Sequence, residues 1–134
     1  MDHFLKHPKV QYIPLSINNL KMGAWQNPFH NYNNPDIYFF QNQEDLSSKL
    51  SHYKLPDIEL APEEFNHCIA VLALNFKVER GYFRFLTAKY IGEKKEGHFQ
   101  VFCVTKKYFP KRVLHFALYT EEGKKISWEN VEII

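Results

Sequence analysis

Apolar residues change their spacing along the chain, and this change separates one helical segment from several strands. Leu46, Leu50 and Tyr53 follow an i, i+4, i+7 pattern, which places them on one face of a helix. Asn42 precedes this stripe, and its short polar side chain is suited to capping the first turn. The pattern therefore predicts one main helix near residues 43–53.

Apolar runs follow this helix at the spacing of antiparallel hairpins. Residues 68–76 are almost continuously apolar, which is typical of a strand covered on both faces. Residues 92–97 place four charged residues between two glycines, which predicts a hairpin loop. The other expected strands are residues 36–40, 82–91, 98–105, 113–119 and 126–134. The predicted class is α+β and mainly β, with an antiparallel sheet or sandwich of about five to seven strands.

The N-terminal quarter has a weaker pattern. Pro14 confines the partial alternation around it to an edge strand or an extended arm. Asn and Pro dominate residues 26–36, which predicts a loop. The length of 134 residues fits one domain. We therefore expect a single domain, 1–134, in which residues 1–35 form an irregular arm and loop and residues 36–134 form the β-rich core.

The composition suits one packed core, because 45% of the residues are hydrophobic and 16% are aromatic. No run of about 18 apolar residues occurs, so neither a membrane-spanning helix nor a membrane partner is expected. The first eight residues lack the apolar region of a signal peptide, and no cysteine lies near them to carry a lipid. The predicted location is therefore cytoplasmic.

Charge is distributed unevenly between the two halves of the chain. Residues 1–66 hold 5 lysines and 8 acidic residues, a net charge of −3. Residues 67–134 hold 12 lysines and arginines and 7 acidic residues, a net charge of +5. A basic half favours an anionic partner. The same charges also suit strand edges and turns, where lysine keeps a sheet soluble.

Both cysteines, Cys68 and Cys103, lie inside apolar runs, where a buried free thiol is expected. A disulfide between them requires their two strands to be neighbours. Cys68 with His67, or Cys103 with His115, is conceivable as a catalytic pair, although burial makes a thiol unreactive. No spacing resembles a zinc site, and no phosphate-binding glycine loop occurs. The sequence therefore predicts no metal, no cofactor and no enzymatic activity.

The segment 80–85 combines one glycine, three aromatic residues and two arginines. Its first three residues match the start of an RNA-recognition signature, and the next two do not. We interpret the glycine as a turn between two strands. Strand alternation then directs Phe83 and Phe85 into the core, and Tyr82 and Arg84 toward solvent or a partner.

The favoured function is a non-enzymatic protein-binding module that acts as a small regulator, inhibitor or assembly factor. This prediction depends on the missing catalytic pattern and on the many aromatic residues, which are frequent at binding hot spots. The candidate protein-binding residues are Trp25, Phe29, His30, Tyr32, Tyr82 and Arg84. The chain is expected to be a monomer, or a homodimer if the edge of residues 131–134 is left unpaired.

The alternative function is nucleic-acid binding through the loop of residues 106–112. This loop places four cations around two aromatic residues, as a surface for phosphates and stacked bases would. Its candidate residues are Lys106, Lys107, Tyr108, Lys111 and Arg112.

Short motifs in the C-terminal three quarters of the chain also suggest a relationship. They are Gln43-Glu44-Asp45-Leu46, Leu55-Pro56-Asp57-Ile58-Glu59, Phe65 before the apolar run 69–74, and Gly81-Tyr82. In this order they resemble the C-terminal domain of the PrcB family, which is named for a subunit that supports a surface protease complex. The resemblance covers about residues 36–134. It implies a β-rich binding module without catalysis.

Overall fold

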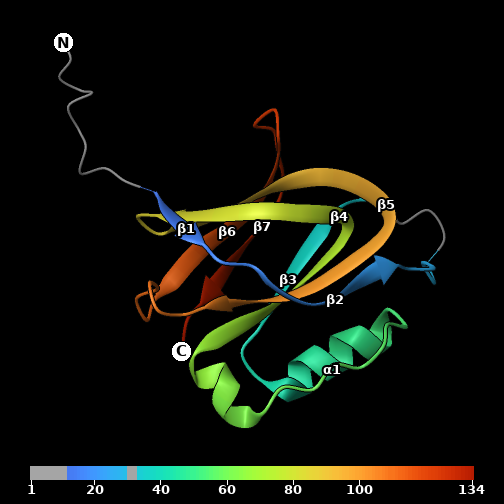
Figure 1. Ribbon diagram of the computed structural model, residues 1–134, viewed down its shortest axis with the longest axis horizontal. Helices are drawn as coiled ribbons and strands as arrows, with labels where there is room; N and C mark the ends of the chain where they lie inside the picture. The colour runs from blue at the N-terminus through green and yellow to red at the C-terminus, as the bar shows by residue number, and fades with distance from the viewer. Residues whose placement is uncertain (1–11, 30–32) are drawn as a thin grey trace.

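The computed structural model describes residues 12–29 and 33–134 and confirms a fold that is α+β and mainly β (Figure 1). In these residues seven strands form one open mixed sheet. The elements are β1 (Ile13–Leu15), β2 (Asn18–Ala24), β3 (Asp36–Phe40), α1 (Gln43–His52), the 3₁₀ helix η1 (Pro62–Asn66), β4 (Cys68–Arg84), β5 (Thr87–Thr105), β6 (Val113–Thr120) and β7 (Lys125–Glu132).

Two long strands, β4 and β5, form an antiparallel ribbon that organises the whole sheet. A two-residue turn, Phe85 and Leu86, joins them. The ribbon bends in its middle, where the register shifts between Leu74 and Phe76 and again between Val78 and Arg80. Figure 1 shows both strands curving through this bend. Each strand therefore contributes its two ends to two differently oriented parts of the sheet.

We call these two parts sheet I and sheet II. Sheet I contains β3, the Cys68 end of β4, the Thr105 end of β5, and β2, in that order. Sheet II contains β1, the Arg84 end of β4, the Thr87 end of β5, β6 and β7. Helix α1 packs on sheet I, and sheet II lies on the opposite side of sheet I (Figure 1).

The strands β5 and β6 are parallel, which corrects the expectation of an entirely antiparallel sheet. The bend explains this arrangement, because it brings the end of β5 back near its own beginning. The backbone N–H of His115 donates to the Leu86 carbonyl at 2.8 Å, and Phe109 packs on Phe83 with ring centroids 5.0 Å apart. The connection 106–112 therefore delivers β6 beside the first residues of β5, in the same direction.

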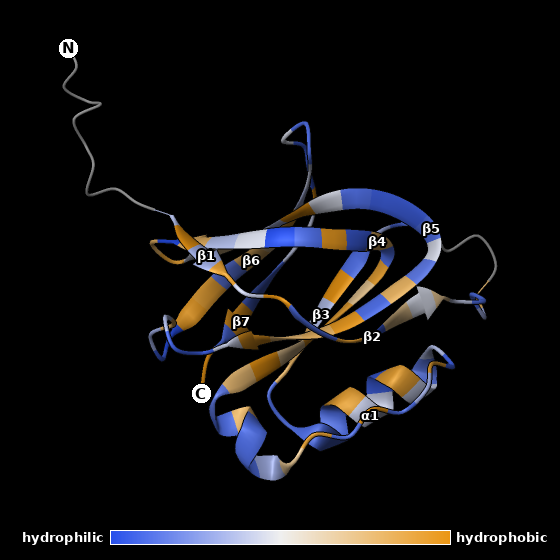
Figure 2. Ribbon diagram, in the orientation of Figure 1, coloured by the Kyte–Doolittle hydropathy of each residue, from blue (hydrophilic) through white to orange (hydrophobic). Residues whose placement is uncertain are grey.

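Two hydrophobic cores lie on the two faces of sheet I. The inner core fills the space between sheets I and II, and the outer core lies between sheet I and α1. Along β4, Ile69, Val71 and Ala73 join the inner core, whereas Ala70, Leu72 and Leu74 join the outer core. This confirms a strand covered on both faces. Figure 2 shows this apolar segment and the polar middle of both long strands.

Helix α1 forms as the sequence predicts. The Asn42 side chain accepts a hydrogen bond from the Asp45 N–H at 2.8 Å and so satisfies one of the free amides of the first turn. Leu46, Leu50 and Tyr53 are buried in the outer core. The apolar stripe therefore fixes the helix against sheet I.

The predicted hairpin at residues 92–97 is wrong, because these residues continue β5 through the bend. A Cβ atom on Gly92 would overlap the carbonyl oxygen of Lys77 on the facing strand, so this glycine serves a close approach of two backbones. Gly97 has a φ of +75° and donates its N–H to the Asn75 side chain at 3.0 Å. The glycines therefore allow a bent strand, not a chain reversal.

The predicted turn at Gly81 and the predicted burial of Phe85 are also wrong. Gly81 lies within β4, where an added Cβ would stand 2.8 Å from the ring of the buried Tyr90. The chain reverses instead at Phe85, which has a φ of +58° and is 73% exposed. Phe83 lies in the inner core as predicted.

The N-terminal region is more regular than expected, because residues 1–35 contribute β1 and β2 to the sheet. Ile13 pairs with Phe83 of β4, and the residues of β2 pair with β5. Pro14 lies in β1 at an edge of the sheet, where its missing N–H is tolerated. The apolar pattern is weak here because edge strands bury few of their side chains.

The edge formed by residues 131–134 is covered, which removes the particular unpaired edge considered for a homodimer. Gln41 donates its side-chain N–H to the Glu132 carbonyl at 2.7 Å and accepts from the Ile134 N–H at 3.0 Å. The amide side chain therefore takes the place of a neighbouring strand at this point.

Replacing Gly92 with alanine should lower the free energy of unfolding by about 2 kcal/mol or more, because the new methyl group meets the Lys77 backbone. Gly23→Ala is the matched control. Its Cβ would stand 3.8 Å from the Phe99 ring, an ordinary contact, so we expect a change within about 0.5 kcal/mol. Urea denaturation of both variants measures their free energies of unfolding. Equal destabilisation by both would contradict the close approach at the bend.

The stability of the protein should depend on the protonation of His98, which is buried beside the bend. Burial, and then the charges of Lys95 and Lys77, lower the pKa of His98 below its ordinary 6.5. The unfolded chain therefore binds this proton first as the pH falls. The contribution of neutral His98 to the free energy of unfolding is therefore complete above about pH 7 and is lost progressively below it. His98→Asn should flatten the pH dependence of the unfolding free energy between about pH 7 and 5.5.

Candidate functional site

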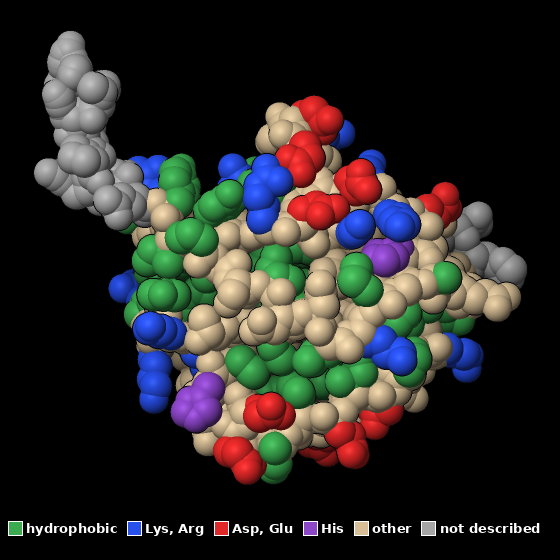
Figure 3. Space-filling view, viewed as in Figure 1, with side chains coloured by type: hydrophobic (Ala, Val, Ile, Leu, Met, Phe, Trp, Pro, Cys, Tyr) green, Lys and Arg blue, Asp and Glu red, His purple; other side chains and the backbone are tan. Residues whose placement is uncertain are grey.

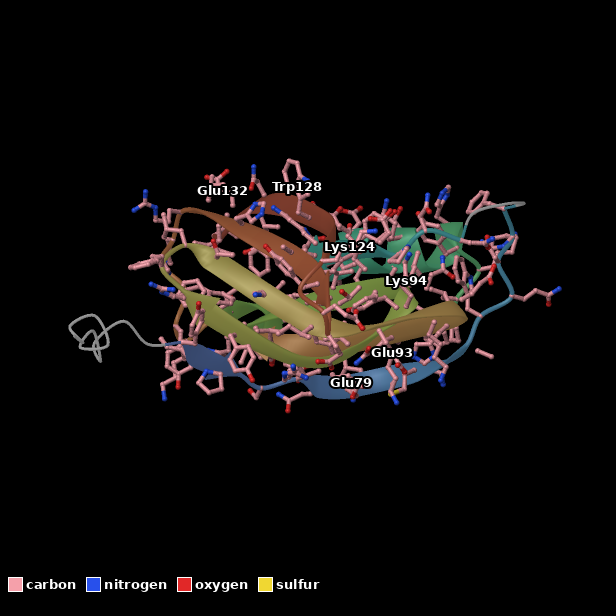
Figure 4. The ribbon with its side chains drawn as sticks, turned by 90° about the horizontal axis from the view of Figure 1, so that it is seen from above. Glu79, Glu93, Lys94, Lys124, Trp128 and Glu132 are labelled. Carbon is pink, nitrogen blue, oxygen red and sulfur yellow. The ribbon has the colours of Figure 1, made fainter. Side chains whose placement is uncertain are left out.

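The outer face of sheet II carries a continuous row of side chains from five strands. Pro14, Tyr82, Lys89, Ala117 and Trp128 are successive cross-strand partners. Figure 4 looks toward this side, with the strands of sheet II in front and α1 behind them. Trp128 stands at the rim, points away from the strands and is 57% exposed.

Polar and aromatic residues on both sides of this row complete the surface. We call the set the aromatic–basic face. It consists of Tyr12, Tyr82, Arg84, Lys89, His115, Tyr119, Lys125 and Trp128. None of these residues belongs to either hydrophobic core.

Three cations on the face lie over aromatic rings. Arg84 is 5.1 Å from the ring centroid of Tyr12. Lys89 is 4.4 Å from that of Tyr119, and Lys125 is 5.6 Å from that of Trp128. Among the described residues, no carboxylate forms an ion pair with Arg84, Lys89 or Lys125. The cations are therefore held in place by ring faces and keep their charge available to an anion.

His115 belongs to the same cluster. Its Nε2 atom lies 2.9 Å from the Lys125 ammonium group, which is able only to donate, so Nε2 accepts. Its Nδ1–H then donates to the Asn130 side-chain oxygen at 3.0 Å. The imidazole also packs on Trp128, with centroids 5.4 Å apart. His115 therefore positions Lys125 and Trp128.

The catalytic pairing of Cys103 with His115 finds no support in this geometry. Both ring nitrogens of His115 have other partners, and Cys103 lies beside Cys68 on the neighbouring strand. Burial, and then Cys68, raise the pKa of the Cys103 thiol to about 12. The two strands are neighbours, which meets the condition set for a disulfide, but both thiols are free.

The basic loop of residues 106–112 adjoins one end of the aromatic–basic face. The turn that joins β4 to β5 lies at the same end of the molecule (Figure 1). Tyr108 is exposed with the Lys107 ammonium 5.5 Å from its ring, and Lys111 and Arg112 are exposed. Lys106 is partly buried, which lowers its pKa, and it donates to the Ile134 carbonyl at 3.2 Å. Three of the four cations of this loop therefore face solvent.

The structure separates the residues predicted to bind protein. Trp25 is only 5% exposed and donates its Nε1–H to the Tyr53 carbonyl at 2.8 Å, so it belongs to the outer core and is not a surface residue. Phe29 is 39% exposed and packs on His52 and Tyr53. The segment after β2 and the strand β1 lie at opposite ends of the molecule (Figure 1).

Of the remaining predicted residues, Tyr82 and Arg84 lie on the aromatic–basic face, and His30 and Tyr32 lie outside the described residues. Six members of that face were not predicted as binding residues: Tyr12, Lys89, His115, Tyr119, Lys125 and Trp128. Alternation within the expected strands 82–91, 113–119 and 126–134 would have placed most of them opposite the core. It would not have shown that they share one surface, because the parallel pairing of β5 and β6 was not foreseen.

The side of the molecule that carries α1 is acidic. Exposed acidic residues gather on α1, η1 and the segment between them: Glu44, Asp45, Asp57, Glu59, Glu63 and Glu64. Figure 3 shows this acidic side at the bottom. Near the bend, Glu79, Glu93 and Lys94 mix both signs (Figure 4). Arg80 is matched there by Glu121 at 2.8 Å, which lowers the pKa of that carboxyl.

Comparison with protein-family models, curated proteins and solved structures found no match for this chain. The resemblance to the PrcB family stays a prediction. Among the described residues, no helix is long and apolar enough to cross a membrane. In the same residues, no group of three or more histidine, cysteine or acidic side chains is arranged to hold a metal ion.

The two thiols should differ in reactivity. Because the pKa of Cys103 is about 12, roughly one thiol in ten thousand is ionised at about pH 8. We expect iodoacetamide to label the half-buried Cys68 first in the native protein and to leave Cys103 unmodified until unfolding. Mass spectrometry of the Cys68→Ser variant isolates Cys103. Rapid labelling of Cys103 in that variant would restore the case for an activated thiol.

Proposed function

We propose that this protein is a non-catalytic module that binds single-stranded nucleic acid on the aromatic–basic face. One observation carries the proposal: an outer sheet face presents aromatic rings with cations held against them. Single-strand binders combine such rings, which stack on bases, with cations that follow the phosphates.

The spacing along the row suits an extended nucleotide chain. Tyr82 and Trp128 are separated by three strand-to-strand steps, which span about 14 Å at roughly 4.8 Å per step. A stacked strand rises about 3.4 Å per nucleotide, so this distance corresponds to about four nucleotides. Lys89 lies between the two rings in the row and is placed to contact a phosphate. Unpaired bases are required, because a duplex hides the base faces that would stack.

The basic loop extends the same surface. Lys107, Lys111 and Arg112 continue the positive charge beyond the edge of the face where β4 ends at Arg84. Six exposed acidic residues lie on the side of the molecule that carries α1, which disfavours an anionic ligand there. The loop named by the alternative hypothesis thus joins a larger surface. A nucleic-acid ligand agrees with the cytoplasmic location predicted from the sequence.

Protein binding is the second candidate function, as a small regulator, inhibitor or assembly factor. A different observation favours it: the strand β2 is exposed along nearly its whole length and borders a groove. This site does not overlap the aromatic–basic face.

Replacing Tyr82 or Trp128 with alanine should weaken binding of a labelled ten-nucleotide U or dT homopolymer by roughly 5- to 150-fold, because a stacked base is worth about 1–3 kcal/mol. Phe29→Ala is the matched control, since Phe29 is an exposed aromatic residue outside the face. Fluorescence anisotropy at low salt measures the affinities, and circular dichroism checks the fold. The absence of binding by the unaltered protein, or equal losses in all three variants, would overturn the proposal.

Salt dependence tests the cations separately from the rings. Lys89→Gln should reduce the slope of log K against log salt by about 0.7, the value expected for one phosphate contact on a single strand. Lys54→Gln removes an exposed charge on another side of the molecule and should leave the slope unchanged. Equal slopes for Lys89→Gln and the unaltered protein would exclude a phosphate contact at Lys89.

A further inference from the structure

A second surface lies at the other edge of the sheet, where β2 forms the outermost strand of sheet I. Within the described residues, β2 pairs only with β5, so its outer edge has no neighbouring strand. All of its residues except Gly23 are exposed, and Leu20 and Met22 are 40% and 38% exposed. A free strand edge presents backbone N–H and C=O groups at alternate residues, which an extended chain is able to pair with.

Part of this edge is regular enough to accept another strand. Lys21, Met22, Gly23 and Ala24 pair without interruption with four consecutive residues of β5. The one irregularity of β2 is a bulge at Leu20, before this segment. A bulge and a lysine are also devices that prevent indiscriminate pairing of an edge strand. Together they favour a partner whose charge is opposite to that of the lysine.

A groove of about 730 Å³ runs beside this edge, between β2 and the segment that follows α1. Phe99 and Trp25 contribute apolar surface to it, and Gly23 leaves it open. The groove exists because the outer core ends before β2: no residue of β2 belongs to it. Lys54, with a φ of +58°, redirects the chain after the helix and forms part of the far wall.

The charge of the groove points to its ligand. Lys21 and Lys54 both line it, and no acidic residue is among its described lining residues. We propose that β2 and this groove bind an extended acidic peptide segment of a protein partner, which adds a strand to sheet I. Alternate side chains of that peptide lie in the groove, so one apolar side chain contacts Phe99 and acidic neighbours contact the two lysines. This inference is independent of nucleic-acid binding on sheet II.

The test uses a labelled eight-residue peptide that alternates acidic and β-branched residues, added to the whole ¹⁵N-labelled protein. Amide shifts are expected in β2 and near Lys54, with none around Trp128. Lys21→Glu combined with Lys54→Glu should weaken binding at least tenfold, a loss of about 1.4 kcal/mol. Lys89→Glu combined with Lys125→Glu is the charge-matched control on the aromatic–basic face and should bind the peptide as the unaltered protein does.

Two altered peptides complete the design. A peptide with lysine in place of each acidic residue, and one with alternate N-methylated backbone amides, should each bind at least tenfold more weakly. The proposal is overturned if no amide shifts appear at about 1 mM peptide, or if the shifts are confined to sheet II. Equal binding of all three peptides would also overturn it. So would a dimer in light scattering whose formation shifts the amides of β2, because a second copy of this chain would then occupy the edge. Loss of nucleic-acid binding in Trp128→Ala with peptide binding intact distinguishes the two sites.

Discussion

The buried amide of Gln100 holds the bend on which the two-sheet arrangement depends. Its side chain accepts the Val78 N–H at 2.8 Å and donates to the Val78 carbonyl at 3.3 Å, as a neighbouring strand would, and it also donates to the Asn19 side chain at 2.7 Å. Asn75, in left-handed geometry at φ +57°, satisfies the facing Gly97 N–H. A buried backbone group without a partner costs about 1–3 kcal/mol, so a bend without these amides would be strongly unfavourable.

The aromatic–basic face is a consequence of this bend. Beyond it, the Arg84 end of β4 turns Phe83 into the inner core and Tyr82 outward. The connection after β5 then lays β6 parallel to Lys89 and its neighbours, and β7 follows with Trp128. Because α1 packs on sheet I, it does not cover these side chains. Residues far apart in the chain therefore meet on one surface only because the ribbon folds back.

Sequence reasoning predicted the features that depend on local chemistry. The helix followed from the Asn42 cap and the Leu46 and Leu50 stripe, and the doubly covered strand followed from its continuous apolar residues. It missed the reversal at Phe85, because a bulky residue in left-handed geometry gives no turn signal. It also took Gly92 for part of a loop, because a glycine required by a facing backbone looks the same in sequence as one required by a turn. Tyr82 and Arg84 were correctly predicted to point outward. Which residues surround them was not predicted, because these come from strands that are brought together by the long-range pairing of β5 with β6.

The two tryptophans show why aromatic content alone does not locate a binding surface. Trp25 satisfies its N–H at the Tyr53 carbonyl and is covered by the outer core, so its aromatic area is already used for stability. Trp128 lies on a strand whose outer side has no covering layer. Among the described residues, the ring and cation contacts of its indole are those with His115 and Lys125. Exposed apolar surface of this size gains nothing from folding, and ordered cations around it lose rotamer freedom. An arrangement that orders both without burying either supports the proposal of a ligand that stacks on the ring and carries negative charge.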